Sequence, residues 1–126
     1  GFSPATRAEG VTPAADPHLP QPLWFKDYAV DVEQADPDSM LALYRAALAI
    51  RQESLTATRD TTAEQVDMGD DVVAYTRAAV GGRVFTSITN FGNAPVALPD
   101  GSVVLASGPL TPEGQLPTDT SAWVVQ

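Results

Sequence analysis

The stretch "DPDSMLALYRAALAIRQ", residues 36–52, constrains the fold most, because no other part of the chain has a clear helical period. Asp36 suits the N-cap, Pro37 suits the first helical position, and Asp38 puts negative charge where the helix dipole favours it. Apolar residues then recur every three or four positions: Met40, Leu43, Tyr44, Ala47 and Leu48, flanked by Leu41 and Ile50. We therefore predict one helix, over about 37–53, whose broad apolar face needs a partner surface.

Residues 1–35 show neither a helical nor a strand period, and they are rich in proline. The run "PHLPQP" excludes helix interior and central strand, because proline lacks the backbone N–H that both require. We expect a long loop here. Trp24, Phe25 and Tyr28 add large aromatic area to it, which we interpret as anchoring the loop to a body; stacking on a sugar ring is the alternative.

From about residue 64 the apolar period changes to two, which is typical of strands. Gly81-Gly82 predicts a hairpin turn, and the "PDG" run at 99–101 predicts a second turn. About six short strands at this spacing predict an antiparallel β-sandwich over 61–126, with Trp123 in its core. The expected strands are 64–68, 71–79, 83–91, 94–99, 102–107 and 120–125. The fold class is therefore mainly β, with a long loop and one α-helix before the sandwich.

Charge and composition exclude several function classes. The net charge is −9, with 5 basic and 9 acidic residues in 1–60 and 2 basic and 7 acidic residues in 61–126. Because neither half has a basic patch, we expect no binding to nucleic acid or to an anionic membrane surface. No signal peptide is visible, and no apolar run approaches the roughly 20 residues that span a bilayer.

The absence of cysteine excludes a disulfide framework and thiolate chemistry, and it suits a cytoplasmic protein. The chain begins with Gly1 and not with methionine, from which we expect a processed product or a fragment.

Catalytic candidates are sparse. The close acidic pairs, Asp36/Asp38 and Asp70/Asp71, lie at a predicted helix start and before a predicted strand, so we interpret them as capping and turn residues. His18, the sole histidine, has no nucleophile motif near it. We predict no catalytic residue and no metal or cofactor site, because no spaced ligand set, calcium loop or phosphate-binding glycine loop is present.

The first half of the chain resembles the end of the catalytic domain of glycoside hydrolase family 13, the α-amylase family. In its α-glucosidase and oligo-1,6-glucosidase members a "PWLP-x-P/N" loop precedes "V-x-x-Q…DPDS-x-L-x-x-YR-x-L-x-x-LR". This run is matched here from Val32 to Arg51, although His18 stands where the family usually has tryptophan. The run "ITNFGNAPVALP", residues 88–99, is similar to part of that family's C-terminal β-domain.

The resemblance implies that residues 1–60 finish a (β/α)8 barrel and that 61–126 form the C-terminal β-sandwich. The helix at 37–53 would be the last barrel helix, and its partner would be the N-terminal catalytic barrel of the same protein. The parent enzyme would be a retaining α-glucosidase that hydrolyses terminal α-glucosidic bonds of short oligosaccharides. The segment itself would be structural and inactive, and His18, Gln21 and Trp24 would contact substrate at the entrance of the intact enzyme.

Two alternatives stay open. Within the same family, the parent could be a transglucosidase, such as a sucrose isomerase or a trehalose-forming enzyme. From a different class, the chain could be a free-standing carbohydrate-binding or interaction module. The module predicts that residues 62–126 cover Leu41, Tyr44 and Leu48, whereas the barrel interpretation predicts that this helix face is left for another polypeptide.

Overall fold

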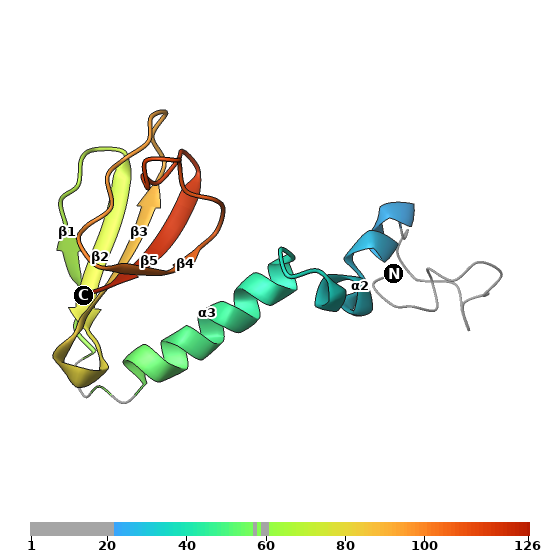
Figure 1. Ribbon diagram of the computed structural model, residues 1–126, viewed down its shortest axis with the longest axis horizontal. Helices are drawn as coiled ribbons and strands as arrows, with labels where there is room; N and C mark the ends of the chain where they lie inside the picture. Colours follow the sequence, from blue (N-terminus) through green and yellow to red (C-terminus); the bar gives the residue numbers. More distant parts are fainter. Residues whose placement is uncertain (1–21, 57, 59–60) are drawn as a thin grey trace. The chain divides into compact units, whose positions relative to one another are not determined.

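The computed structural model describes residues 22–56, 58 and 61–126, and divides the chain into two compact units, Gly1–Ala46 and Ala47–Gln126 (Figure 1). The first unit contains the 3-10 helix η1 (Leu23–Tyr28), the helix α2 (Val30–Ala35) and the beginning of the helix α3 (Met40–Leu55). The second unit contains the rest of α3 and all the strands.

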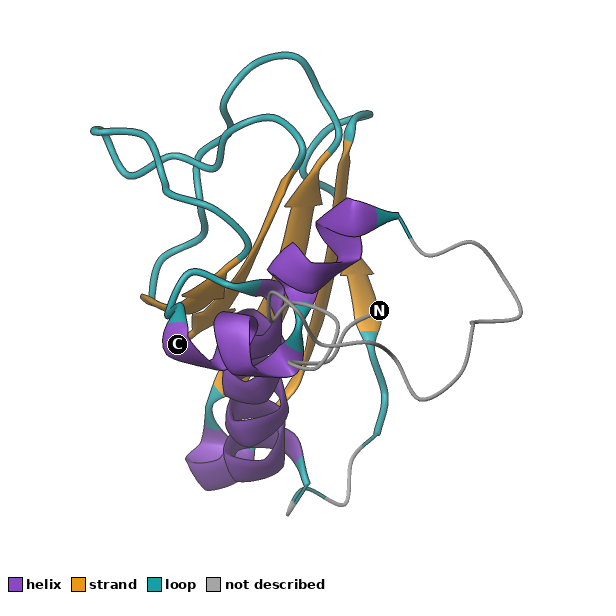
Figure 2. Cartoon of the chain, turned by 90° about the vertical axis from the view of Figure 1, so that its right-hand side faces the viewer, coloured by secondary structure: helices purple, strands orange, loops and turns teal. Residues whose placement is uncertain are grey.

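The strands form one antiparallel sheet (Figure 2), in the order β1-β2-β3-β5-β4 that the labels of Figure 1 show. Their bounds are β1 (Glu64–Val66), β2 (Val72–Ala78), β3 (Val84–Asn90), β4 (Ser102–Ala106) and β5 (Thr120–Val125). The predicted hairpin is confirmed: β2 and β3 pair from Val72↔Asn90 to Ala78↔Val84, and the short 3-10 helix η2 (Val80–Gly82) joins them. Gly81 and Gly82 have φ values of 77° and 74°, which glycine adopts without strain.

The core lies on one face of the sheet, where Ala74, Ile88 and Ala122 stand side by side on β2, β3 and β5. The loops between the strands cover this face with Leu116, which is fully buried, and with the partly buried Met68, Val96, Leu98 and Leu110. Val66 of β1 and Ala106 of β4, also partly buried, pack against the same cluster. The antiparallel β-sandwich prediction is therefore confirmed, with loop segments as the layer opposite the sheet.

Three local expectations were wrong. Residues 94–99 form no strand: Val96 makes an isolated bridge to Leu116, because Pro95 and Pro99 cannot donate to a ladder. Trp123 lies on the opposite face from the core, where it is partly buried and meets Phe85 edge to face at 5.2 Å. Residues 22–35, expected as loop, contain η1 and α2.

The start of α3 also differs from its prediction. Ser39 and not Asp36 is the cap: its Oγ accepts a hydrogen bond from the Ala42 N–H at 3.2 Å. The Asp36 carboxylate accepts from the Asp38 N–H at 2.9 Å, and Asp36 also closes α2, its N–H donating to the Glu33 carbonyl. Two good capping residues stand three positions apart, and the second begins α3. The helix then continues to Leu55, beyond its expected end near 53.

Candidate functional site

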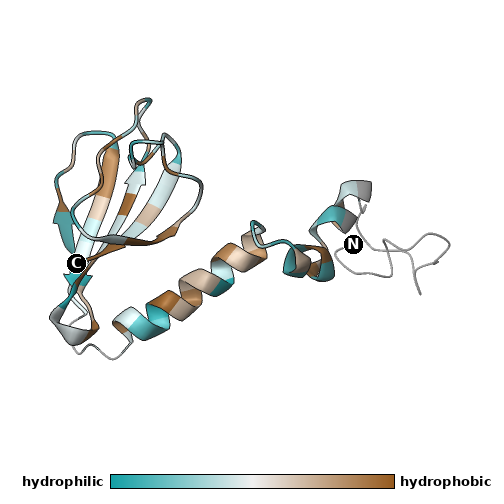
Figure 3. Ribbon diagram, in the orientation of Figure 1, coloured by the Kyte–Doolittle hydropathy of each residue, from teal (hydrophilic) through white to brown (hydrophobic). Residues whose placement is uncertain are grey.

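The apolar face of α3 is only partly used by the sheet. Ile50 and Leu55, near its C-terminal end, pack against a second cluster made of Ala79, Phe85, Val125 and the partly buried Trp123. The other apolar residues continue along the helix toward its N-terminal end (Figure 3). The C-terminal end of α3 is thus attached to the sheet, on the face opposite the core.

Met40, Tyr44 and Leu48, which we call the helix stripe, are 59%, 63% and 60% exposed. Their spacing of four residues places them one above the other on one helix face. Leu41 is half-buried. Side chains of this size at helical spacing are normally buried, because each contributes about 1.5–3 kcal/mol when removed from water. Met40 and Tyr44 therefore have no cover among the described residues of the first unit, and Leu48 has none among those of the second.

The aromatic residues of η1 contact one another. The Trp24 ring lies 4.6 Å from the Phe25 ring and 5.7 Å from the Tyr28 ring, both edge to face. Trp24 is 56% exposed and Tyr28 is 54% exposed. Of the three predicted entrance residues, Trp24 is therefore accessible, whereas His18 and Gln21 lie outside the described residues.

A cleft of about 210 Å³ opens beside the second cluster, between the end of α3 and the sheet. Tyr75 and Trp123 are cross-strand neighbours of Ser87, and Arg51 approaches from the helix. The lining consists of Arg51, Leu55, Ala63, Tyr75, Thr76, Arg77, Phe85, Ser87 and Trp123. This combination of aromatic rings and guanidinium groups suits a ligand or segment that is apolar and carries negative charge.

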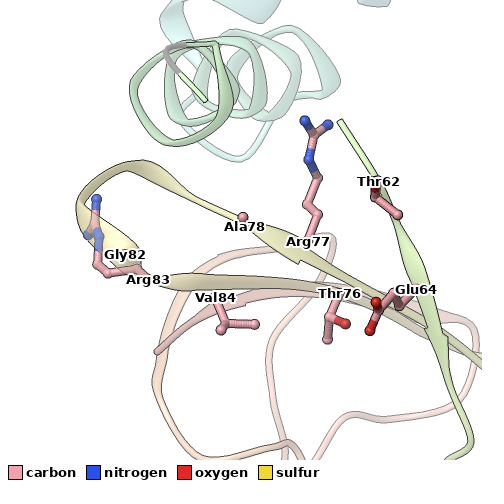
Figure 4. Close-up of a pocket in the computed structure, with 8 residues that line it drawn as sticks. All are labelled: Thr62, Glu64, Thr76, Arg77, Ala78, Gly82, Arg83 and Val84. Carbon is pink, nitrogen blue, oxygen red and sulfur yellow. The ribbon is translucent and has the colours of Figure 1, made fainter. Parts of the chain in front are cut away.

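A second hollow, of about 300 Å³, lies at the end of the β2–β3 hairpin (Figure 4). Figure 4 shows Arg77 and Thr76 on opposite sides of β2, with Val84 on the side of Thr76. Arg83 donates from Nε to the Val80 carbonyl at 3.0 Å, which ties it to the turn. Because its residues point to opposite sides of the sheet, this hollow brings few of them together.

The acidic pairs do not form a glycosidase-like carboxylate pair. Asp36 and Asp38 belong to the turn before α3, and Asp70 and Asp71 lie in the turn that enters β2, where the Asp71 carbonyl accepts from the Phe91 N–H at 2.8 Å. Within 22–56, 58 and 61–126, no group of three or more acidic or histidine side chains could hold a metal ion. Across the same residues, no helix has the length and apolar character needed to cross a bilayer.

Sequence reasoning found the helix stripe but missed the cleft. The available signal was β2, "VVAYTRA", in which Val72 and Ala74 face the core while Val73 and Tyr75 lie on the opposite face. A strand with apolar residues on both faces indicates a sheet that is covered on both sides.

Neither a family model nor a curated protein matches the chain. Solved structures do. A variant of the trehalulose synthase MutB from Pseudomonas mesoacidophila MX-45, in complex with Tris, is 25% identical with a TM-score of 0.68, and the match covers 90% of this chain and 23% of that one.

Two further structures share the fold at lower identity. The isomaltulose synthase SmuA from Protaminobacter rubrum is 22% identical with a TM-score of 0.68, over 89% of this chain and 22% of that one. The trehalose-6-phosphate hydrolase TreA from Bacillus licheniformis, a mutant form in complex with PNG, is 20% identical with a TM-score of 0.69. This match covers 89% of this chain and 22% of that one. The chain thus spans less than a quarter of the length of each of these enzymes, and it corresponds to their C-terminal part.

Proposed function

We infer that this chain belongs to glycoside hydrolase family 13 and forms the C-terminal segment of a retaining α-glucosidase, an inference supported by its similarity to the solved enzymes described above. In this proposal residues 1–60 finish the catalytic barrel and residues 61–126 form the C-terminal β-sandwich. The parent enzyme hydrolyses terminal α-glucosidic bonds of short oligosaccharides, through a glucosyl-aspartate intermediate. The exposed helix stripe, on a helix whose far end is packed on the sheet, is the observation that carries this proposal.

The role of the segment is structural. The helix stripe covers apolar barrel surface, and the contact of Ile50 and Leu55 with the sheet ties the sandwich to the barrel's last helix. Complete burial of three such side chains contributes about 5–9 kcal/mol, which is comparable with the whole stability of a typical domain. A chain that left this surface in water would lose that contribution.

The family chemistry requires a pair of carboxylates that the described part of this segment does not supply. A retaining glycosidase needs two carboxyl groups roughly 5–5.5 Å apart across the scissile bond. The acidic pairs of the described residues serve turns instead. We therefore expect the isolated chain not to hydrolyse a nitrophenyl α-glucoside, whereas the complete polypeptide does. Turnover by the purified 126-residue chain would contradict this.

A transglucosidase is the second candidate, and a specific observation favours it: the 25% match is to a trehalulose synthase. The two reactions are separated by their products. Given sucrose, an α-glucosidase releases two monosaccharides, whereas an isomerase returns mainly a rearranged disaccharide. Product analysis of the complete polypeptide by chromatography decides between them.

A free-standing module receives less support. It requires the sandwich to cover the helix face, but Leu48, which lies in the same compact unit as the sandwich, is 60% exposed. We further propose that Trp24, with His18 and Gln21, contacts substrate at the entrance of the intact enzyme, since the Trp24 ring is accessible.

The cysteine-free composition leads us to propose a cytoplasmic location.

A further inference from the structure

The turn that leads into β4 (Figure 1) contains the chain's only Asp-Gly dipeptide, Asp100-Gly101, and the sequence has no Asn-Gly dipeptide. Glycine has no side chain to shield its backbone nitrogen, so this nitrogen can approach the carboxyl carbon of the preceding aspartate and close a five-membered imide ring. Both residues are exposed. Solvent therefore reaches both groups that this reaction uses.

The two reacting groups are free of competing hydrogen bonds. Neither the Asp100 carboxylate nor the Gly101 N–H has a partner among the residues that the structure describes. No hydrogen bond of either group therefore has to break before the Gly101 nitrogen attacks the carboxyl carbon.

Gln126 activates the peptide bond between these two residues. Its Nε2 donates to the Asp100 carbonyl oxygen at 2.6 Å. A donor at this oxygen stabilises the negative charge that spreads onto it when the Gly101 nitrogen loses its proton, which favours the nucleophilic form of the amide. Backbone hydrogen bonds in both directions between Gln126 and Val84, at 3.0 and 3.2 Å, hold the Gln126 backbone in place. The sheet thus positions the residue that supplies the donor.

Asp38-Ser39 provides a contrasting environment. Asp38 is exposed, and serine is also a small residue. The Ser39 N–H, however, donates to the Asp36 carbonyl at 3.2 Å, and Ser39 is buried just before α3. Ring closure at Asp38 therefore requires the start of the helix to open first.

We propose that Asp100-Gly101 is a modification site at which isoaspartate forms spontaneously. The Gly101 nitrogen bonds to the side-chain carboxyl carbon of Asp100, and one water leaves, made from the carboxyl hydroxyl and the proton of the nitrogen. Water then adds to the imide. Cleavage between the nitrogen and the side-chain carbonyl restores aspartate, whereas cleavage between the nitrogen and the main-chain carbonyl leaves isoaspartate. The net change is an isomerisation, because the water lost is regained.

The modification acts on the junction of β4 with β5. It adds one carbon to the main chain directly before Ser102, which pairs with Val125. Gly101 has no room for an added atom, since a Cβ there would lie 2.8 Å from the Val125 carbonyl oxygen. We therefore expect the isoaspartate form to loosen β4, with hydrogen exchange of the β4 amides at least about threefold faster. Unchanged exchange would contradict this effect on β4.

Ageing of the complete polypeptide tests the proposal. Samples are incubated at neutral pH, folded or in urea, and isoaspartate is quantified in each peptide by enzymatic methylation and mass spectrometry. In the folded polypeptide we expect it to form at position 100 within about tenfold of the rate in urea, and at least about tenfold faster than at position 38. Failure of either ratio would overturn the proposal.

Variants test the chemistry at position 100 directly. Asp100→Glu keeps the charge but requires a six-membered ring, so we expect no isomerised product there. Asp100→Asn closes the same ring with loss of ammonia, and hydrolysis then changes the mass. If this variant shows no mass change when folded but does so in urea, the turn blocks ring closure and the proposal is wrong.

The role of Gln126 is tested in the same assay. Gln126→Ala removes the donor to the Asp100 carbonyl and is expected to slow isoaspartate formation about threefold in the folded polypeptide, as the loss of one hydrogen bond does, and not at all in urea. An unchanged folded rate would refute this role. Turnover is not among these readouts, so their outcome is independent of the proposed function.

Discussion

Asn90 organises the loop layer of the sandwich. Its side chain is fully buried, and its Nδ2 donates to the carbonyls of Ala94 at 2.9 Å and Leu116 at 3.1 Å. Its Oδ1 accepts from the Gly92 N–H at 2.9 Å. A buried amide in an otherwise apolar core is stabilising only because all three bonds are made.

Asn90→Ala removes these bonds and leaves buried backbone groups unpaired. We expect it to lower the free energy of unfolding by about 2–4 kcal/mol, measured by urea denaturation of the chain. Asn93→Ala is the matched control, because Asn93 is exposed in the same loop and should change stability by less than about 0.5 kcal/mol. Equal effects of the two substitutions would contradict this role for Asn90.

Substitutions at Gly101 and Gly114 distinguish the cost of backbone strain from the cost of a steric clash. Both have positive φ, at 134° and 77°. A Cβ at position 101 would lie 2.8 Å from the Val125 carbonyl oxygen, whereas a Cβ at position 114 would meet nothing within 4 Å. Thermal unfolding should therefore show that Gly114→Ala costs about 1–2 kcal/mol from strain alone and that Gly101→Ala costs clearly more. A larger loss at 114 than at 101 would refute the clash at Gly101.

At the scale of secondary-structure elements, Ser39 links the helices α2 and α3. Its Oγ accepts from the Ala42 N–H in α3 and donates to the carbonyl of Glu33 in α2 at 2.6 Å. Ser39→Ala should lower the helical circular dichroism signal and cost about 1 kcal/mol, as the loss of an N-cap does. Asp36→Ala should cost less, because the Asp36 carboxylate accepts one exposed bond within a turn. A larger loss for Asp36→Ala would restore Asp36 as the important cap.

Elements with a strong local pattern could be predicted, and those without one could not. The α3 stripe and the Gly81-Gly82 hairpin are local patterns, and both appear in the structure. The 3-10 helix η1 and the six-residue helix α2 have no full apolar period to detect. The capping error arises because Asp36 and Ser39 are both acceptable caps, and only the structure shows that Ser39 also donates to the Glu33 carbonyl of α2.

At the scale of the whole molecule, sequence predicted the apolar helix face but not the cleft beside the second cluster. The cleft depends on strand register, which brings Tyr75, Ser87 and Trp123 into one row across three strands. It also depends on the packing of Leu55 against the second cluster. Neither is a local property, although the apolar residues on both faces of β2 indicated that both sides of the sheet are covered.

The central claim is that the helix stripe is buried by an upstream part of the same polypeptide. It is tested by the free energy of unfolding of the complete polypeptide carrying Leu48→Ala, with Gln52→Ala, at an exposed polar position of the same helix, as the control. We predict a loss of about 2–5 kcal/mol for Leu48→Ala, as for a buried leucine, and almost none for Gln52→Ala. A loss below about 0.5 kcal/mol at Leu48, the value for an exposed side chain, would contradict the claim.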